Sequence, residues 1–192
     1  MKVFFVMILM VSSAMAGTIL WEYFTSSSFP PANWTVTTIG TGGSWTWSNS
    51  SPTEGGYAHG VVSLSGAGSG SATLKTFPFS LTAGNTCSVC LSLRTTTTGS
   101  PTTYSWQLIL FNGTTEVDSA SYDAQPTWLD TCTAFLDIPT TSPNYAIGWR
   151  VSASKTGSGA SSVTFDVDTV HIAEDGVAVE PVSLGRIKGA FH

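Results

Sequence analysis

Two pairs of residues have the types and spacing that binding chemistry needs. Trp45 and Trp47 lie two positions apart in the run SWTWS, and Asp166 and Asp168 lie two apart in TFDVDT. Successive side chains of a β-strand point to opposite faces, so each pair would present both members on one face. Two indole rings could form a platform for a sugar, and two carboxylates could begin a cation site. Each pair also has a structural interpretation, as packed rings in one case and as surface acids that bind nothing in the other.

Tyr57 and His59 follow the tryptophans in the polar stretch 49–60, which the composition predicts to be a loop. Tyr57 is a further ring that could join the tryptophan platform. His59 has no histidine, cysteine or acid at metal-ligand spacing, so we interpret it as a solvated loop histidine.

The two aspartates lie in the most strand-like run of the chain, residues 162–175. Apolar and polar residues alternate from Val163 to Asp168, the pattern of a strand with one buried face. After Asp168 the apolar positions become Val170 and Ile172, so the alternation changes parity. This change predicts either a strand that switches its buried face or a β-bulge.

The composition sets the fold class. The 192 residues are rich in Ser, Thr, Gly and aromatic residues, and short alternating runs are separated by turn signals. This pattern predicts an all-β fold, a two-sheet antiparallel sandwich of about ten strands with no interior helix. Seven Lys and Arg against twelve Asp and Glu, with no basic stripe, exclude nucleic acid as a partner.

The chain divides into three parts. Residues 1–16 resemble a secretory signal peptide, with Lys2, an apolar run and the small-residue site Ala14-Met15-Ala16. Residues 17–175 are predicted to form the sandwich domain, and 176–192 a tail. In the tail, apolar residues at helical spacing allow a short helix that docks on the sandwich or on a partner, and disorder is the alternative. No run is long enough for a transmembrane helix, so we expect a secreted or surface-held protein.

Three cysteines in an oxidising compartment leave at least one thiol unpaired within the chain. Parity in the strand 86–94 points Cys87 into the core and Cys90 outward. A bridge from Cys87 to Cys132 is one alternative, and buried unpaired thiols are the other.

The order of several segments resembles the choice-of-anchor J, or cleaved-adhesin, domains of secreted bacterial proteins, which are related in fold to MAM domains. The matching segments, in chain order, are EYFTSSSFPPANW at 22–34, SATLKTFPFSL at 71–81 followed by Ala83-Gly84, CLSLR at 90–94, and the closing strand 165–172. The chain departs from the family pattern at two positions. Thr169 stands where the family usually has a second closing aspartate, and Tyr23 stands where it often has an acidic residue.

This resemblance implies a jelly-roll sandwich used in adhesion or as an accessory module. It also implies a structural calcium between Glu22 of the first strand and Asp168 of the last, with Asp166 as a further candidate. Backbone carbonyls and water would complete the six to eight oxygen ligands that calcium takes.

Catalytic motifs are missing from the sequence, which has no Gly-x-Ser-x-Gly elbow, His-Glu-x-x-His pair or phosphate loop. A glycoside hydrolase that uses Asp166 and Asp168 is the least favoured interpretation. We therefore predict a non-catalytic module that recognises a glycan or a surface protein through Trp45, Trp47 and Tyr57. The alternative is a structural spacer or accessory domain with no ligand of its own.

Overall fold

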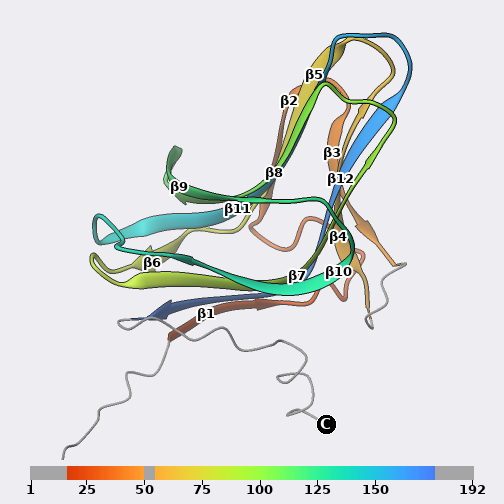
Figure 1. The fold of residues 1–192 in the computed structure, drawn as a ribbon. Helices are drawn as coiled ribbons and strands as arrows, with labels where there is room; N and C mark the ends of the chain where they lie inside the picture. The colour runs from red at the N-terminus through yellow and green to blue at the C-terminus, as the bar shows by residue number, and fades with distance from the viewer. Residues whose placement is uncertain (1–16, 50–54, 176–192) are drawn as a thin grey trace, which may run out of the picture.

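The strands of this chain form two antiparallel β-sheets, as the alternating pattern predicts. The computed structural model describes residues 17–49 and 55–175, and no helix occurs among them. The twelve strands are β1 (Gly17–Glu22), β2 (Thr35–Gly40), β3 (Gly43–Ser48), β4 (Tyr57–Leu64), β5 (Gly68–Lys75), β6 (Phe79–Leu81), β7 (Thr86–Thr98), β8 (Thr103–Asn112), β9 (Thr115–Tyr122), β10 (Gln125–Phe135), β11 (Ser142–Lys155) and β12 (Ser161–Asp175) (Figure 1). The all-β jelly-roll prediction is confirmed, with twelve strands instead of about ten.

The two sheets pack face to face. Sheet A has the order β10-β7-β12-β4-β3, with β1 beside the second half of β12, and sheet B has the order β2-β5-β11-β8-β9, with β6 beside β11. Figure 1 shows that the long strands bend, so that the outer face of sheet B lies inside the bend and the outer face of sheet A outside it. Each sheet therefore has an inner face toward the core and an outer face toward solvent.

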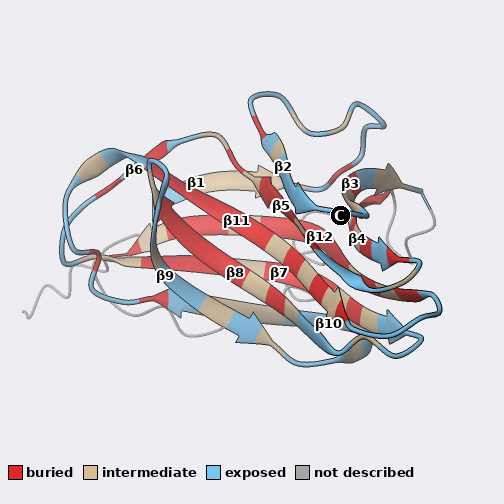
Figure 2. Ribbon diagram, turned by 90° about the horizontal axis from the view of Figure 1, so that it is seen from above, coloured by how far each residue is buried: buried red, intermediate tan, exposed pale blue. Residues whose placement is uncertain are grey.

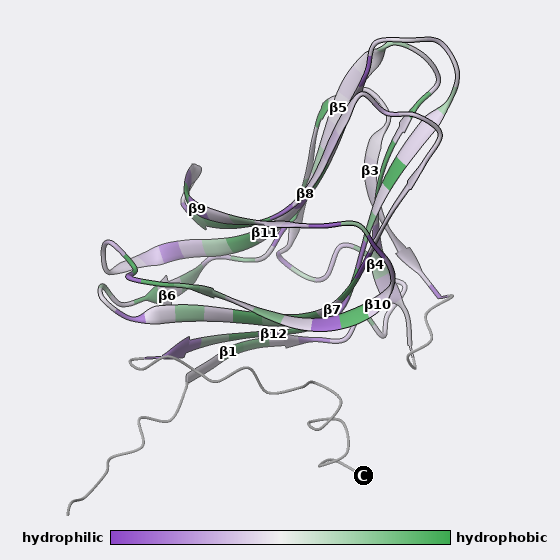
Figure 3. Cartoon of the chain, viewed as in Figure 1, coloured by the Kyte–Doolittle hydropathy of each residue, from purple (hydrophilic) through white to green (hydrophobic). Residues whose placement is uncertain are grey.

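The core lies between the inner faces. Val163, Phe165 and Val167 of β12 are fully buried, as their alternation predicts. The Trp106 indole of β8 crosses the core, and its Nε1 donates to the Thr164 carbonyl of β12 at 2.7 Å, which joins the two sheets. Buried residues run along the long central strands (Figure 2), where the hydrophobic bands also lie (Figure 3).

A β-bulge interrupts β12 where the sequence changes parity. Asp168 pairs with Ser92 of β7 and His171 pairs with Cys90, so two residues of β12 oppose one residue of β7. Thr169 has a φ of 50°, and Val170 and Ile172 are fully buried beyond it. The extra residue returns apolar side chains to the core, which confirms the bulge prediction.

Two strands are longer than predicted because pairing extends them into polar sequence. The stretch 49–60 was expected to be a loop, but Tyr57 pairs with Ser48 and begins β4. The strand expected at 86–94 is also longer, since Thr95 pairs with Phe165, and β7 continues to Thr98. Neighbouring strands thus override a local preference for turns.

Of the two alternatives for the cysteines, the Cys87–Cys132 bridge is wrong, because Cys132 pairs with Cys90, and a buried unpaired thiol is correct for Cys87 alone. Cys132 and Cys90 are direct partners of β10 and β7, and their sulfurs form a disulfide. Cys87 points into the core, as parity predicted, and burial raises the pKa of its thiol to about 12. A thiol with so high a pKa is unreactive at neutral pH.

The predicted signal peptide at 1–16 and the predicted tail at 176–192 lie outside the described residues. Within residues 17–49 and 55–175, no helix has the length and hydrophobicity needed to cross a bilayer.

Candidate functional site

Three charged or titratable side chains lie in one row on the outer face of sheet A. Asp166 of β12 pairs with His59 of β4 on one side and with Arg94 of β7 on the other. Its neighbours Phe165 and Val167 point inward and are fully buried, so Asp166 points outward. The register therefore brings together residues that are far apart in the sequence.

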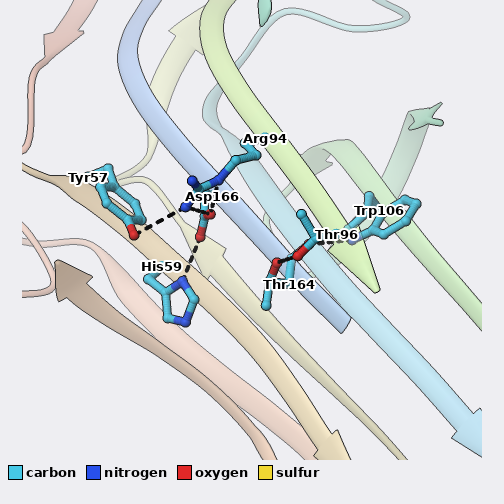
Figure 4. Close-up of polar contacts among 7 residues, drawn as sticks. All are labelled: Tyr57, His59, Arg94, Thr96, Trp106, Thr164 and Asp166. Atoms are coloured by element: carbon cyan, nitrogen blue, oxygen red, sulfur yellow. Dashed lines mark hydrogen bonds and ion pairs between the residues drawn. The ribbon is translucent and has the colours of Figure 1, made fainter. Parts of the chain in front are cut away.

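Asp166 is held by both neighbours (Figure 4). Its Oδ2 accepts from Arg94 Nε at 2.8 Å and from Nη2 at 2.6 Å, and its Oδ1 lies 2.6 Å from His59 Nδ1. The Asp166 side chain is 2% exposed, whereas those of Arg94 and His59 are each 31% exposed. A buried carboxylate is costly unless it is paired, and here the pairing is bidentate.

Two aromatic rings enclose the Arg94 guanidinium. Its Cζ lies 5.2 Å from the ring centre of Trp128 and 5.7 Å from that of Tyr57, within cation–π range. The two rings meet edge to face, 5.3 Å apart. Burial lowers the pKa of Arg94, but the hydrogen bond and the charge of Asp166 outweigh burial and raise it, so the guanidinium stays charged. We call Tyr57, His59, Arg94, Trp128 and Asp166 the Arg94 cluster.

A second aromatic group lies along the same sheet. Trp21 of β1 stacks on His171 of β12 with ring centres 4.0 Å apart, and Tyr23 stacks on Trp21 at 5.8 Å. Tyr23 is 41% exposed, so this stack reaches solvent. Burial lowers the pKa of His171, which favours its neutral form. We call Trp21, Tyr23 and His171 the Trp21 stack.

The predicted Trp45–Trp47 platform is not formed, because these rings are on the inner side of sheet A. Trp45 pairs with Gly60, and Trp47 pairs with Ala58, both inward-facing positions. Trp45 is 5% exposed and packs on Phe165. Gly60 is required there, since a Cβ at this position would lie 2.6 Å from the Trp45 ring. Trp47 is half-buried and donates through Nε1 to the Phe24 carbonyl at 2.7 Å.

Tyr57 and His59 were both expected in a loop, and both lie in β4. Tyr57 is 4% exposed, so its ring packs within the Arg94 cluster and is not accessible for stacking on a ligand. The interpretation of His59 as a solvated loop histidine is wrong, because its ring is bound to Asp166.

The three predicted calcium ligands each have a protein partner. Both oxygens of Asp166 are engaged by Arg94 and His59, which gives this acid a role other than metal ligand. Glu22 Oε1 accepts the Phe24 amide at 2.7 Å, and Asp168 Oδ1 accepts the Thr169 amide at 2.7 Å. In the part of the chain that the structure describes, no three His, Cys, Asp or Glu side chains form a metal-binding group. Calcium at Glu22 and Asp168 stays a prediction.

Sequence reasoning did not single out Arg94 or the Trp21 stack, whereas Trp128 was one of four rings, with Trp45, Trp47 and Tyr57, whose exposure would favour binding. A signal for Arg94 was present, since the parity that points Cys90 outward also points Arg94 outward. The contact of Trp128 with Arg94 could not be predicted, because the register of β10 against β7 shifts between Gln125 and Leu129.

The outer face of sheet B has different chemistry. A groove of about 430 Å³ crosses four of its strands. Ser105 and Ser152 are hydrogen-bonded across β8 and β11 at 2.6 Å, and Thr103 and Ser154 at 2.7 Å. The described residues that line this groove include no charged side chain, and the most exposed large side chains among them are Ile39 and Tyr104.

Comparison with solved structures places the chain in a class, the jelly-roll β-sandwiches. A cyclase from Fischerella sp. TAU is 15% identical with a TM-score of 0.51, over 85% of this chain and 100% of that one. The CBM22-1 xylan-binding domain from Paenibacillus barcinonensis is 8% identical with a TM-score of 0.50, over 87% and 100%. A carbohydrate-binding module of the β-sandwich superfamily is 13% identical with a TM-score of 0.50, over 83% of this chain and 61% of that one.

These likenesses show the fold alone. The chain spans only 20% of a longer match, the enzymatically active domain of bacteriophage CBA120 tailspike protein 4. No family model and no curated protein matches the sequence, so membership of the choice-of-anchor J family stays a prediction.

Proposed function

We propose that this protein is a non-catalytic glycan-binding module whose binding surface is the outer face of sheet A. One observation carries the proposal: the Arg94 cluster and the Trp21 stack combine aromatic rings with fixed polar groups on one sheet. Carbohydrate-binding modules with the same fold, including a xylan-binding domain, support it.

The chemistry of the face suits a polyhydroxylated ligand. Trp128 is half-buried and Tyr23 is exposed, so both offer apolar ring surface for stacking on a sugar. Arg94 and His59 keep part of their side chains open to solvent, where Arg94 N–H groups can donate to hydroxyls and His59 Nε2 can hydrogen-bond to one. The contacts with Asp166 hold both side chains in place before a ligand arrives, which reduces the entropy lost on binding.

A structural spacer without a ligand is the second candidate. The burial of Trp45 and Tyr57 favours it, since two of the rings expected in a binding platform are packed away. The Arg94 cluster would then serve only to link β4, β12 and β7.

We further propose that the module is secreted or held on a cell surface, on the basis of the signal-like residues 1–16. The resemblance to cleaved-adhesin domains supports the same location, and a protein partner would then be the alternative to a glycan.

A glycan array probed with the purified protein tests the proposal. We expect reproducible binding to a subset of glycans that is lost in Trp128→Ala and retained in Tyr104→Ala, which removes an exposed ring from the sheet B groove. A blank array with a folded protein would favour the spacer. Repeating the array in calcium and in chelator tests whether binding needs the predicted calcium.

A further inference from the structure

The loop between β1 and β2 encloses a pocket that the Arg94 cluster does not use. Its volume is about 340 Å³, and the described residues that line it come from positions 22–32. This volume falls in the range of small-molecule sites, which start near 300 Å³. The pocket is therefore large enough for one sugar residue.

Among the described residues that line this pocket, Glu22 is the one that carries a charge. Its Oε1 accepts the Phe24 amide at 2.7 Å, which fixes the orientation of the carboxylate. Phe24 has a φ of 50°, in the left-handed region that non-glycine residues rarely adopt. A held backbone outlier beside a pocket is a common feature of binding sites.

The other walls are aromatic and hydroxylic. Phe29 is half-buried and lines the pocket, with Phe24, which is 2% exposed, packed behind it at a ring-centre distance of 6.4 Å, and Thr25, Ser26 and Ser28 add hydroxyl groups. Ser26 Oγ accepts the Ser28 amide at 3.1 Å, so its O–H can still donate. Aromatic walls supply no oxygen ligands for a metal ion, but they attract organic cations.

We infer that this pocket binds the protonated amine of an amino sugar. The ammonium pairs with Glu22 beside the Phe29 ring, and the sugar hydroxyls bond to the loop hydroxyls. This inference rests on the proposed glycan-binding function and deepens it, because it names a charged sugar class and a second subsite.

An NMR titration of the full-length protein with glucosamine, glucose and N-acetylglucosamine tests the inference. We expect saturable amide shifts at residues 22–32 with glucosamine and none at these positions with the two neutral sugars. Glu22→Gln should weaken glucosamine binding at least tenfold and still accept the Phe24 amide, so the loop keeps its structure. Asp118→Asn, which removes an equal charge from an exposed position on β9, should leave binding unchanged.

The inference is overturned by equal shifts with all three sugars, by glucosamine shifts that persist in Glu22→Gln or fail to appear, or by calcium that displaces glucosamine from the same amides. Its failure is separable from that of the proposed function. Trp128→Ala should abolish binding to array glycans and leave the glucosamine shifts intact, whereas Glu22→Gln should leave binding at the Arg94 cluster intact.

Discussion

On the outer face of sheet A, rings and charges meet in register, with a buried carboxylate held between Arg94 and His59. On the outer face of sheet B, the middle of the face holds paired serine and threonine hydroxyls, and its ion pair between Arg150 and Glu116 is open to solvent. Both faces use the same strand alternation and enclose the same core. The two outer faces therefore differ in chemistry: sheet A combines aromatic rings with a held ion pair, whereas the groove of sheet B offers hydroxyl groups.

The largest expected effect on stability comes from the disulfide, which sheet A has and the described part of sheet B lacks. Cys90–Cys132 closes a loop with a sequence separation of 42 on sheet A. Replacing both cysteines by alanine should lower the free energy of unfolding by about 2–4 kcal/mol, the usual effect of a loop of this size. Urea denaturation measures this loss. An unchanged midpoint would mean that the bond adds nothing to the stability of sheet A.

Breaking the ion pair on sheet A should also lower the free energy of unfolding more than breaking the ion pair on sheet B. Asp166→Asn leaves Arg94 without its bidentate partner, and we expect a loss of about 2–3 kcal/mol, reduced from the fully buried case because Arg94 is partly exposed. Glu116→Gln breaks the exposed pair on sheet B and should cost under about 1 kcal/mol. Equal losses in urea denaturation would show that the two ion pairs contribute equally to stability.

Ligand affinity should depend on sheet A alone. Trp128→Ala should weaken binding of the best array glycan roughly tenfold or more, because truncating a central aromatic anchor costs about 2 kcal/mol. Tyr23→Ala should weaken it less, since this ring lies at the edge of the face. Isothermal titration calorimetry gives both values, and a comparable loss in Tyr104→Ala would place part of the site in the sheet B groove.

The smallest expected effect is a pH dependence from His171. Burial lowers its pKa from 6.5 in the folded protein, so the unfolded chain binds the proton first as the pH falls. Stability should therefore decrease on acidification through and below pH 6.5, and His171→Gln should remove this component. Melting temperatures between pH 5 and 7.5 for both proteins measure it, and identical curves would contradict the assignment to His171.

The fold could be predicted because alternation reports directly on burial. The parity change after Asp168 gave a β-bulge as one of two alternatives, and the outward position of Cys90 was correct. The Cys132 partner was missed because pairing between two strands depends on register, which neither strand carries alone.

The site was predicted less well for the same reason. The spacing of Trp45 and Trp47 places both rings on one face but does not say which face is buried. Their cross-strand neighbours Gly60 and Ala58 are small, so the inner side has room for large rings. His59 and Arg94 acquire their roles only when β12 places Asp166 between them.

The most direct test of the central claim is an NMR titration of the protein with the best array glycan. Binding at sheet A predicts that the largest shifts fall on the Trp128 indole and on the amides of Arg94, His59 and Tyr23, with little change in the sheet B groove. Shifts concentrated at Ser105, Ser152 and Tyr104 would contradict the account, because binding would then lie on the hydroxyl-lined face.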